Sequence, residues 1–223
     1  MLLRAATRRA GVRGFQSRTE HSEWIRRVLR SRKIPPASMV EATIADMAPF
    51  LASVDPFAPQ VRLRHAAPGS VPAGSSSASM LEATWPLSSS PMLQDAVSDG
   101  REGGLAGWSA MRLGKFYEAL DALTGDVAHH HCAAGLSGHA LVTGGHYHSV
   151  KLGRALPGID ITLRCYVTRT GSASLEVRTD AVQLNPTTGA EKLVNVCHTM
   201  MVATDPATSK PVQGDIYTAR LLA

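Results

Sequence analysis

Long apolar runs are missing from this sequence of 223 residues. No stretch approaches the roughly 20 apolar residues that a membrane-spanning helix needs, so we do not expect the chain to cross a bilayer. Cysteine is also scarce, and Cys132, Cys165 and Cys197 have no paired spacing. We therefore expect free thiols in a reducing compartment, with Cys165 and Cys197 buried in strands.

Metal-binding motifs are missing as well. The sequence has neither CxxC nor HExxH, although its nine histidines include residues 129–131, His139, His146 and His148. Consecutive helical residues point about 100° apart, so three histidines in a row cannot reach one metal ion. His146 and His148 would share one face of a strand and could bind Zn²⁺ with a third ligand. Since no motif supports such a site, we expect neither a metal nor a cofactor.

Acidic residues are absent from the first 19 residues, which contain five arginines. This composition, together with a matrix-protease-like Arg-Gly-Phe at 13–15, is typical of a mitochondrial presequence. A basic arm that binds nucleic acid is the less favoured alternative. Residues 1–33 hold ten of the 23 basic and two of the 18 acidic residues, so the remainder carries a net charge of −3. We therefore expect a mitochondrial matrix protein without a general nucleic-acid-binding surface.

One long helix is predicted over residues 113–131. Its apolar residues recur at spacings of three and four: Leu113, Phe116, Leu120, Leu123 and Val127. A second face is small and polar: Gly114, Tyr117, Asp121, Gly125 and Ala128. Gly costs a helix about 1 kcal/mol relative to Ala, so Gly125 indicates close approach to that face. Asp121 is either a solvated helix residue or a catalytic carboxylate that faces a cleft.

The apolar period changes from 3.6 to 2 after residue 139, which indicates strands. Alternating apolar and polar residues predict strands near 139–150, 159–169, 173–184 and 192–204, separated by turn sequences. Residues 80–86 are predicted to form an earlier strand. A long helix followed by antiparallel strands is an α+β arrangement, in which the helix covers the apolar face of the sheet.

The N-terminal third is predicted to be an extension of this domain. Short helices are expected near residues 20–32 and over 37–53, and residues 55–78 have the Pro, Gly, Ser and Ala content of a linker. The chain is therefore divided into a presequence (1–19), a helical extension with its linker (20–79), the main domain (80–211) and a C-terminal tail (212–223).

Three segments that carry the helix and strand pattern resemble a known family. RLGKFYEALDALTGDVAHHHC, HSVKLGRALPGIDITLRCYVTRTGSASLEVRTDAVQL and KLVNVCHTMMVATD are similar to hotdog-fold acyl-CoA thioesterases, in particular to the mitochondrial family with two hotdog repeats per chain. LEATWPLSSSPMLQD is similar to the entry into that family's first domain. The resemblance spans residues 80–211, but only one repeat is present. It implies a single hotdog domain, with a long central helix wrapped by an antiparallel sheet.

The resemblance also implies a site at the interface between two hotdog units. Asp121 occupies the position of the family's helix carboxylate, which activates water for thioester hydrolysis, and Glu118 is a second candidate one turn earlier. Backbone N–H groups at Leu113 and Gly114 would stabilise the oxyanion. Ser109 stands roughly where the family's second repeat supplies an Asn.

Two functions remain open from the sequence. The first is a matrix acyl-CoA thioesterase that acts as a dimer and needs no cofactor, which Asp121 favours. The second is a non-catalytic hotdog subunit of a large mitochondrial assembly, such as a mitoribosome or a respiratory complex, which Ser109 and the missing repeat favour. The fold does not decide between an enzyme and a structural subunit.

Overall fold

The computed structural model describes residues 39–42, 61–67, 70, 75–97, 112–132, 140–151, 155–156 and 158–212. The chain divides into two compact units, Met1–Ile34 and Pro35–Ala223, and all described residues belong to the second. The calls for a presequence, for a helix near 20–32 and for a tail beyond 212 lie outside the described residues.

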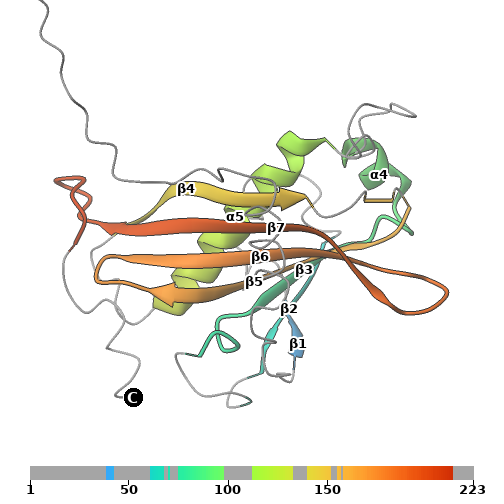
Figure 1. The fold of residues 1–223 in the computed structure, drawn as a ribbon, viewed down its shortest axis with the longest axis horizontal. Helices are drawn as coiled ribbons and strands as arrows, with labels where there is room; N and C mark the ends of the chain where they lie inside the picture. The colour runs from blue at the N-terminus through green and yellow to red at the C-terminus, as the bar shows by residue number, and fades with distance from the viewer. Residues whose placement is uncertain are drawn as a thin grey trace, which may run out of the picture. The chain divides into compact units, whose positions relative to one another are not determined.

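A seven-stranded antiparallel sheet forms the framework of the described region. Its spatial order is β1-β2-β3-β5-β6-β7-β4, so β4 lies at one edge (Figure 1). In chain order the strands are β1 (Met39–Ala42), β2 (Arg62–Ala66), β3 (Leu81–Trp85), β4 (Ala140–Lys151), β5 (Ile161–Thr170), β6 (Ser174–Leu184) and β7 (Glu191–Thr204). The strands predicted at 80–86 and after residue 139 are confirmed, with bounds shifted by at most two residues.

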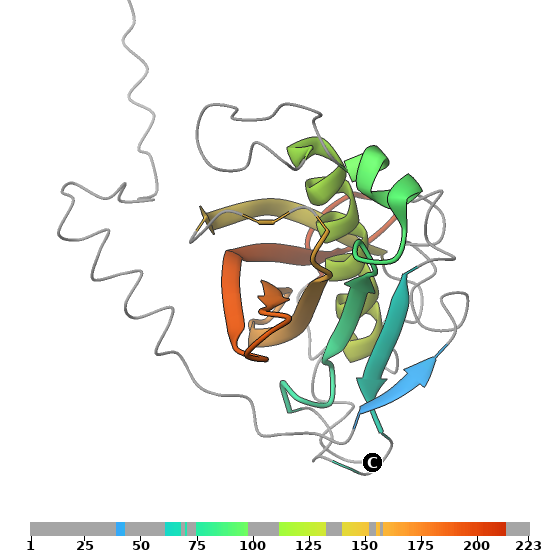
Figure 2. The ribbon, with the colours of Figure 1, turned by 90° about the vertical axis from the view of Figure 1, so that its right-hand side faces the viewer.

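A 20-residue helix, α5 (Leu113–Cys132), packs on one face of this sheet and contacts β3, β4, β5, β6 and β7 (Figure 2). Phe116 is 1% exposed, and Leu120, Leu123 and Val127 are fully buried among inward-facing strand residues such as Leu163. The predicted apolar stripe is confirmed for these four residues. A shorter helix, α4 (Pro91–Val97), begins after Ser90, whose hydroxyl accepts a hydrogen bond from the backbone N–H of Leu93 at 3.3 Å. Neither described helix is long and apolar enough to cross a lipid bilayer.

Two expectations for the N-terminal third are wrong. Residues 39–42 form β1 instead of part of a helix over 37–53, and residues 62–66 form β2 inside the segment interpreted as a linker. β2 pairs with both β1 and β3, so the sheet starts well before residue 80. In β2 Leu63 is 1% exposed while its neighbours Arg62 and Arg64 face solvent. This period-2 pattern is only five residues long, and the surrounding Pro, Gly and Ser concealed it.

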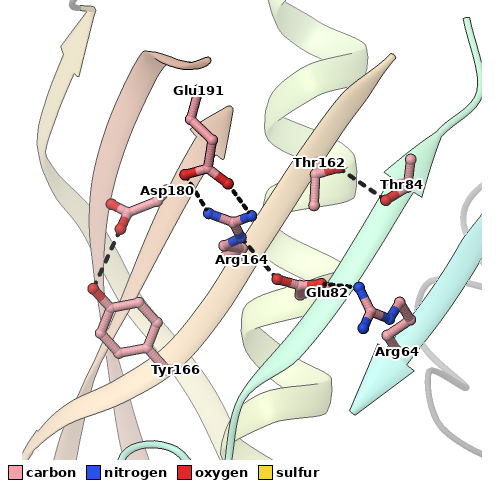
Figure 3. A network of polar contacts seen from close by, with 8 residues as sticks. All are labelled: Arg64, Glu82, Thr84, Thr162, Arg164, Tyr166, Asp180 and Glu191. Carbon is pink, nitrogen blue, oxygen red and sulfur yellow. Dashed lines mark hydrogen bonds and ion pairs between the residues drawn. The ribbon is translucent and has the colours of Figure 1, made fainter. Parts of the chain in front are cut away.

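The face of the sheet turned away from α5 carries a ladder of charged side chains (Figure 3). Glu82 of β3 accepts from Arg64 of β2 at 3.3 Å and from Arg164 of β5 at 2.7 Å, and Arg164 also donates to both carboxylate oxygens of Glu191. The pairing lowers the pKa of Glu191 and raises that of Arg164. Beside it, Thr84 and Thr162 share a hydrogen bond of 2.9 Å. The ladder therefore links the paired strands β2, β3 and β5, and through Arg164 it reaches the start of β7 on the far side of β6.

The three cysteines are free and buried, as expected for Cys165 and Cys197. The Sγ of Cys165 lies 3.1 Å from the Oγ1 of Thr179, and burial raises the pKa of the Cys165 thiol. A buried thiol that stays protonated is a poor nucleophile, so Cys165 has a structural role.

Candidate active site

Asp121 lies on the flank of α5 that faces β4, and its side chain is 52% exposed. Its Oδ1 accepts a hydrogen bond from the hydroxyl of Thr143 at 3.0 Å, and lies 3.3 Å from Nε2 of His146. Both side chains belong to β4. The carboxylate is therefore held from one side by one strand, although half of it remains in contact with solvent.

A β-bulge brings Thr143 and His146 to the same face of β4. In a regular strand two residues three positions apart point to opposite faces. Here Thr143 pairs with Met201 and His146 with Thr199, because Gly144 is an extra residue without a partner between them. Gly145, next to it, has a φ of +151°, a backbone conformation that residues other than Gly rarely adopt. The bulge at these two adjacent glycines therefore allows both Thr143 and His146 to reach Asp121.

His146 is held at its other ring nitrogen as well. Nδ1 lies 2.7 Å from the hydroxyl oxygen of Thr199, a fully buried residue of β7. The ring centroid is 6.2 Å from that of Tyr117 on α5. Because a carboxylate can only accept, the proton of a neutral His146 belongs on Nε2, and the Thr199 hydroxyl then donates to Nδ1. Asp121, His146 and Thr199 thus form a continuous chain of polar contacts that runs from the surface into the core.

A cleft of about 290 Å³ opens beside Asp121, between α5 and strands β4 and β7. Its lining residues are Glu118, Asp121, Ala122, Gly125, His129, Leu141, Thr143 and Met201. The volume is close to the lower end of the range for small-molecule sites, about 300–1,000 Å³. Burial lowers the pKa of His129, so its neutral form is favoured where the cleft approaches the end of α5. Gly125, where the sequence predicts close approach, lies in this lining.

Of the other predicted site residues, Glu118 lies beside this carboxylate, whereas the helix start at Leu113 and Gly114 lies outside the cleft lining. Glu118 lines the same cleft but is 54% exposed, and it pairs with Lys115 at 2.5 Å. Leu113 begins α5, and Gly114 follows it as an exposed residue of the first turn, outside the cleft lining. Ser109 lies outside the described residues. The structure thus brings Asp121 and Glu118 together, and leaves the helix start about two turns away.

Sequence reasoning missed Thr143 and Thr199, and considered His146 only as a metal ligand beside His148. The signal that could have found them is the Gly144-Gly145 pair inside a strand pattern, since glycine within a strand often marks a bulge. Within the described ranges, no group of three His, Cys, Asp or Glu side chains is placed to hold a metal ion.

The sheet order and the long helix packed on it define the class, an α+β hotdog fold. No family model and no curated protein sequence matches the chain. Among solved structures, it is similar to an acyl-CoA hydrolase mutant from Staphylococcus aureus, with a TM-score of 0.51 and 17% identity over 64% of this chain and 76% of that one. At this identity the similarity shows the fold alone.

The chain is also similar to two further solved structures. One is an acyl-CoA hydrolase from Staphylococcus aureus in complex with butyryl coenzyme A, coenzyme A and coenzyme A disulfide, with a TM-score of 0.48 and 16% identity over 60% of this chain and 71% of that one. The other is an apo-hexameric acyl-CoA thioesterase, with a TM-score of 0.46 and 22% identity over 64% of this chain and 78% of that one.

Proposed function

We propose that this protein hydrolyses acyl-CoA thioesters with Asp121 as the general base. The observation that carries the proposal is the state of this carboxylate. Oδ1 is occupied by Thr143 and His146, whereas Oδ2 has no hydrogen-bond partner among the residues that the structure describes. A carboxylate that lines a cleft with one oxygen fixed and the other available is suited to accept a proton from water.

The reaction follows from these positions. The oxygen of a water molecule attacks the thioester carbonyl carbon while its proton moves to Oδ2 of Asp121. The tetrahedral intermediate collapses, the C–S bond breaks with its electron pair on sulfur, and Asp121 returns the proton to the departing thiolate. The products are a carboxylic acid and coenzyme A. The apolar side chains of Leu141 and Met201 in the cleft would contact the acyl chain.

The oxyanion donors proposed at Leu113 and Gly114 would act on a thioester whose water is held by Asp121 of a second copy of the chain. Gly114 and Asp121 are seven residues apart, which corresponds to about 10 Å along a helix axis. Because the base holds the attacking water and the donors hold the carbonyl oxygen, one thioester would have to stretch across most of this separation to use both from the same helix. In a homodimer each site would combine Asp121 of one protomer with the helix start of the other. The edge strand β4, beside the cleft, offers backbone groups for such an association.

The catalytic role is tested by replacing Asp121 with Asn, which keeps the shape but removes the proton acceptor. General-base catalysis contributes about 10²- to 10⁴-fold, so acyl-CoA hydrolysis should fall by that factor, measured as thiol release. Asp95→Asn is a matched control, because Asp95 is an exposed carboxylate on another helix, α4. Wild-type protein without activity on short, medium and long acyl-CoA would sink the proposal. It would favour a non-catalytic subunit of a large mitochondrial assembly.

The proposed location is the mitochondrial matrix, as in the two-repeat thioesterase family that the sequence resembles. Its support is the arginine-rich N-terminus without acidic residues. Residues 1–30 fused to a fluorescent reporter should carry it into mitochondria. The matched control replaces Arg4, Arg8 and Arg9 with Gln, which removes positive charge and should leave the reporter in the cytosol. A wild-type fusion that remains cytosolic would contradict the proposed location.

A further inference from the structure

The carboxylate of Asp121 is held in one orientation although its side chain is half exposed. An exposed aspartate on a helix rotates freely about its side-chain bonds, and ordering it costs conformational entropy. In this protein the Thr143 hydroxyl donates a hydrogen bond to Oδ1, and Nε2 of His146 lies 3.3 Å from the same oxygen. Because both come from β4, they fix which oxygen faces the strand and which remains for the water. A freely rotating carboxylate would present its two oxygens without distinction.

Of Thr143 and His146, His146 is the stronger candidate for orienting Asp121, because its own ring is held in place by a second contact. Nδ1 meets the hydroxyl of Thr199 at 2.7 Å, and Thr199 is fully buried in the strand next to β4. A buried hydroxyl in the middle of a paired strand is a rigid anchor. The imidazole thus transmits the position of β7 to a carboxylate on α5, with the ring of Tyr117 beside it.

We infer that His146, anchored by Thr199, is a positioning residue that aims Oδ2 of Asp121 at the attacking water. This inference rests on the proposed hydrolysis, and His146 acts only through Asp121. The bulge at Gly144 is its structural precondition, because a regular strand would turn His146 to the opposite face of the sheet.

Kinetics of paired variants test the inference. A misplacement of about 1 Å costs a catalytic group about 10²-fold, so His146→Leu should lower kcat about 10- to 100-fold with little change in KM. His146→Gln keeps an N–H donor at similar reach, and should recover most of kcat. Thr199→Val removes the anchoring hydroxyl at constant shape and should lower kcat, whereas Thr199→Ser should preserve it. His65→Leu, on β2, is the control and should match the wild type.

A second measurement is independent of activity. In protein labelled with ¹⁵N-histidine, the ring signals of His146 are assigned by their loss in His146→Gln. The inference requires that neutral His146 carries its proton on Nε2, that Asp121→Ala shifts the Nε2 signal and that Thr199→Val shifts the Nδ1 signal. This experiment separates the inference from the proposed function, because it gives a result even if the wild type hydrolyses nothing.

The outcomes are distinct. Loss of kcat in His146→Leu, recovery in His146→Gln and the two expected NMR shifts together support the inference. An inactive wild type with both shifts present removes the proposed hydrolysis but keeps the coupling of His146 to Asp121. A proton on Nδ1, signals unaffected by either substitution, or equal kcat in His146→Leu and wild type would overturn the inference.

Discussion

The two carboxylate oxygens of Asp121 have different surroundings, and this difference indicates a role for the residue. Its side chain is half exposed, which on a helix usually means a solvated residue without a defined role. The convergence of Thr143 and His146 on Oδ1 changes that interpretation, because the two oxygens of the carboxylate are no longer equivalent. Exposure of the whole side chain therefore says little about function here, and the contacts of each oxygen say more.

Gly145 is the residue on which this arrangement depends most. Its φ of +151° lies in a region that is nearly restricted to glycine, and occupying it with another residue costs about 1–3 kcal/mol. A Cβ at this position has open space, with nothing within 4 Å, so the cost is in the backbone alone. Gly145→Ala should therefore lower the midpoint of urea unfolding and, by relaxing the bulge, reduce kcat.

The neighbouring glycine provides the control for that prediction. Gly144 has no positive φ, and a Cβ there would lie 3.3 Å from Cγ2 of Val202 and 3.4 Å from the backbone oxygen of Met200, so these neighbours must shift by a few tenths of an ångström but the backbone conformation is ordinary. Gly144→Ala should have the smaller effect on both unfolding and kcat. If the two substitutions behave alike, backbone strain at Gly145 is not what holds the bulge.

At the scale of elements, α5 and the long strands could be predicted from the sequence, whereas the site could not. The spacing from Phe116 to Val127 fits a 3.6-residue period over three turns, and each strand from β4 to β7 is at least ten residues long, enough for several residues of alternation. β1 and β2 are too short for such evidence. The contacts of Thr143 and His146 with Asp121 could not be predicted, because a bulge interrupts the period-2 rule on which strand prediction depends.

The charged ladder across β2, β3, β5 and β7 gives a pH-dependent prediction. Pairing with Arg164 holds the pKa of Glu191 below its usual 4.5 in the folded state. The pair therefore stabilises the fold fully above pH 4.5, and this contribution is lost as the pH falls through the lowered value. Because the Glu191 side chain is 47% exposed, Glu191→Gln should lower the free energy of unfolding by less than about 1 kcal/mol at pH 7. The difference should vanish in strong acid.

Glu82 provides the comparison within the same ladder. Its side chain is only 10% exposed, and it lies between two guanidinium groups. Glu82→Gln should cost more than Glu191→Gln in urea unfolding at pH 7, since desolvated pairs are screened less than exposed ones. If Glu82→Gln lowers the free energy of unfolding by the same amount or less, the ladder does not contribute to stability through its buried pairs.

For the whole molecule, the separation between Gly114 and Asp121 leads to the most decisive prediction. If each site takes its base from one protomer and its oxyanion donors from the other, two different inactive variants should restore each other. Gly114→Pro removes one N–H in the first helical turn, where that group has no partner within the helix and proline is tolerated. Gly114→Ala retains the N–H, has open space for its Cβ, and should behave as wild type.

Mixing Gly114→Pro with Asp121→Asn under conditions that exchange subunits tests this arrangement directly. Random association makes half of the dimers mixed, and each mixed dimer has one intact site out of two, so activity should rise to about a quarter of wild type. The native mass should be about twice the chain mass of 23.7 kDa. Activity that stays at the mean of the two parents would place base and oxyanion donors in one chain. The distance along α5 favours the mixed arrangement, because the helix start and Asp121 lie about 10 Å apart on one helix, which a single thioester and its water would have to span.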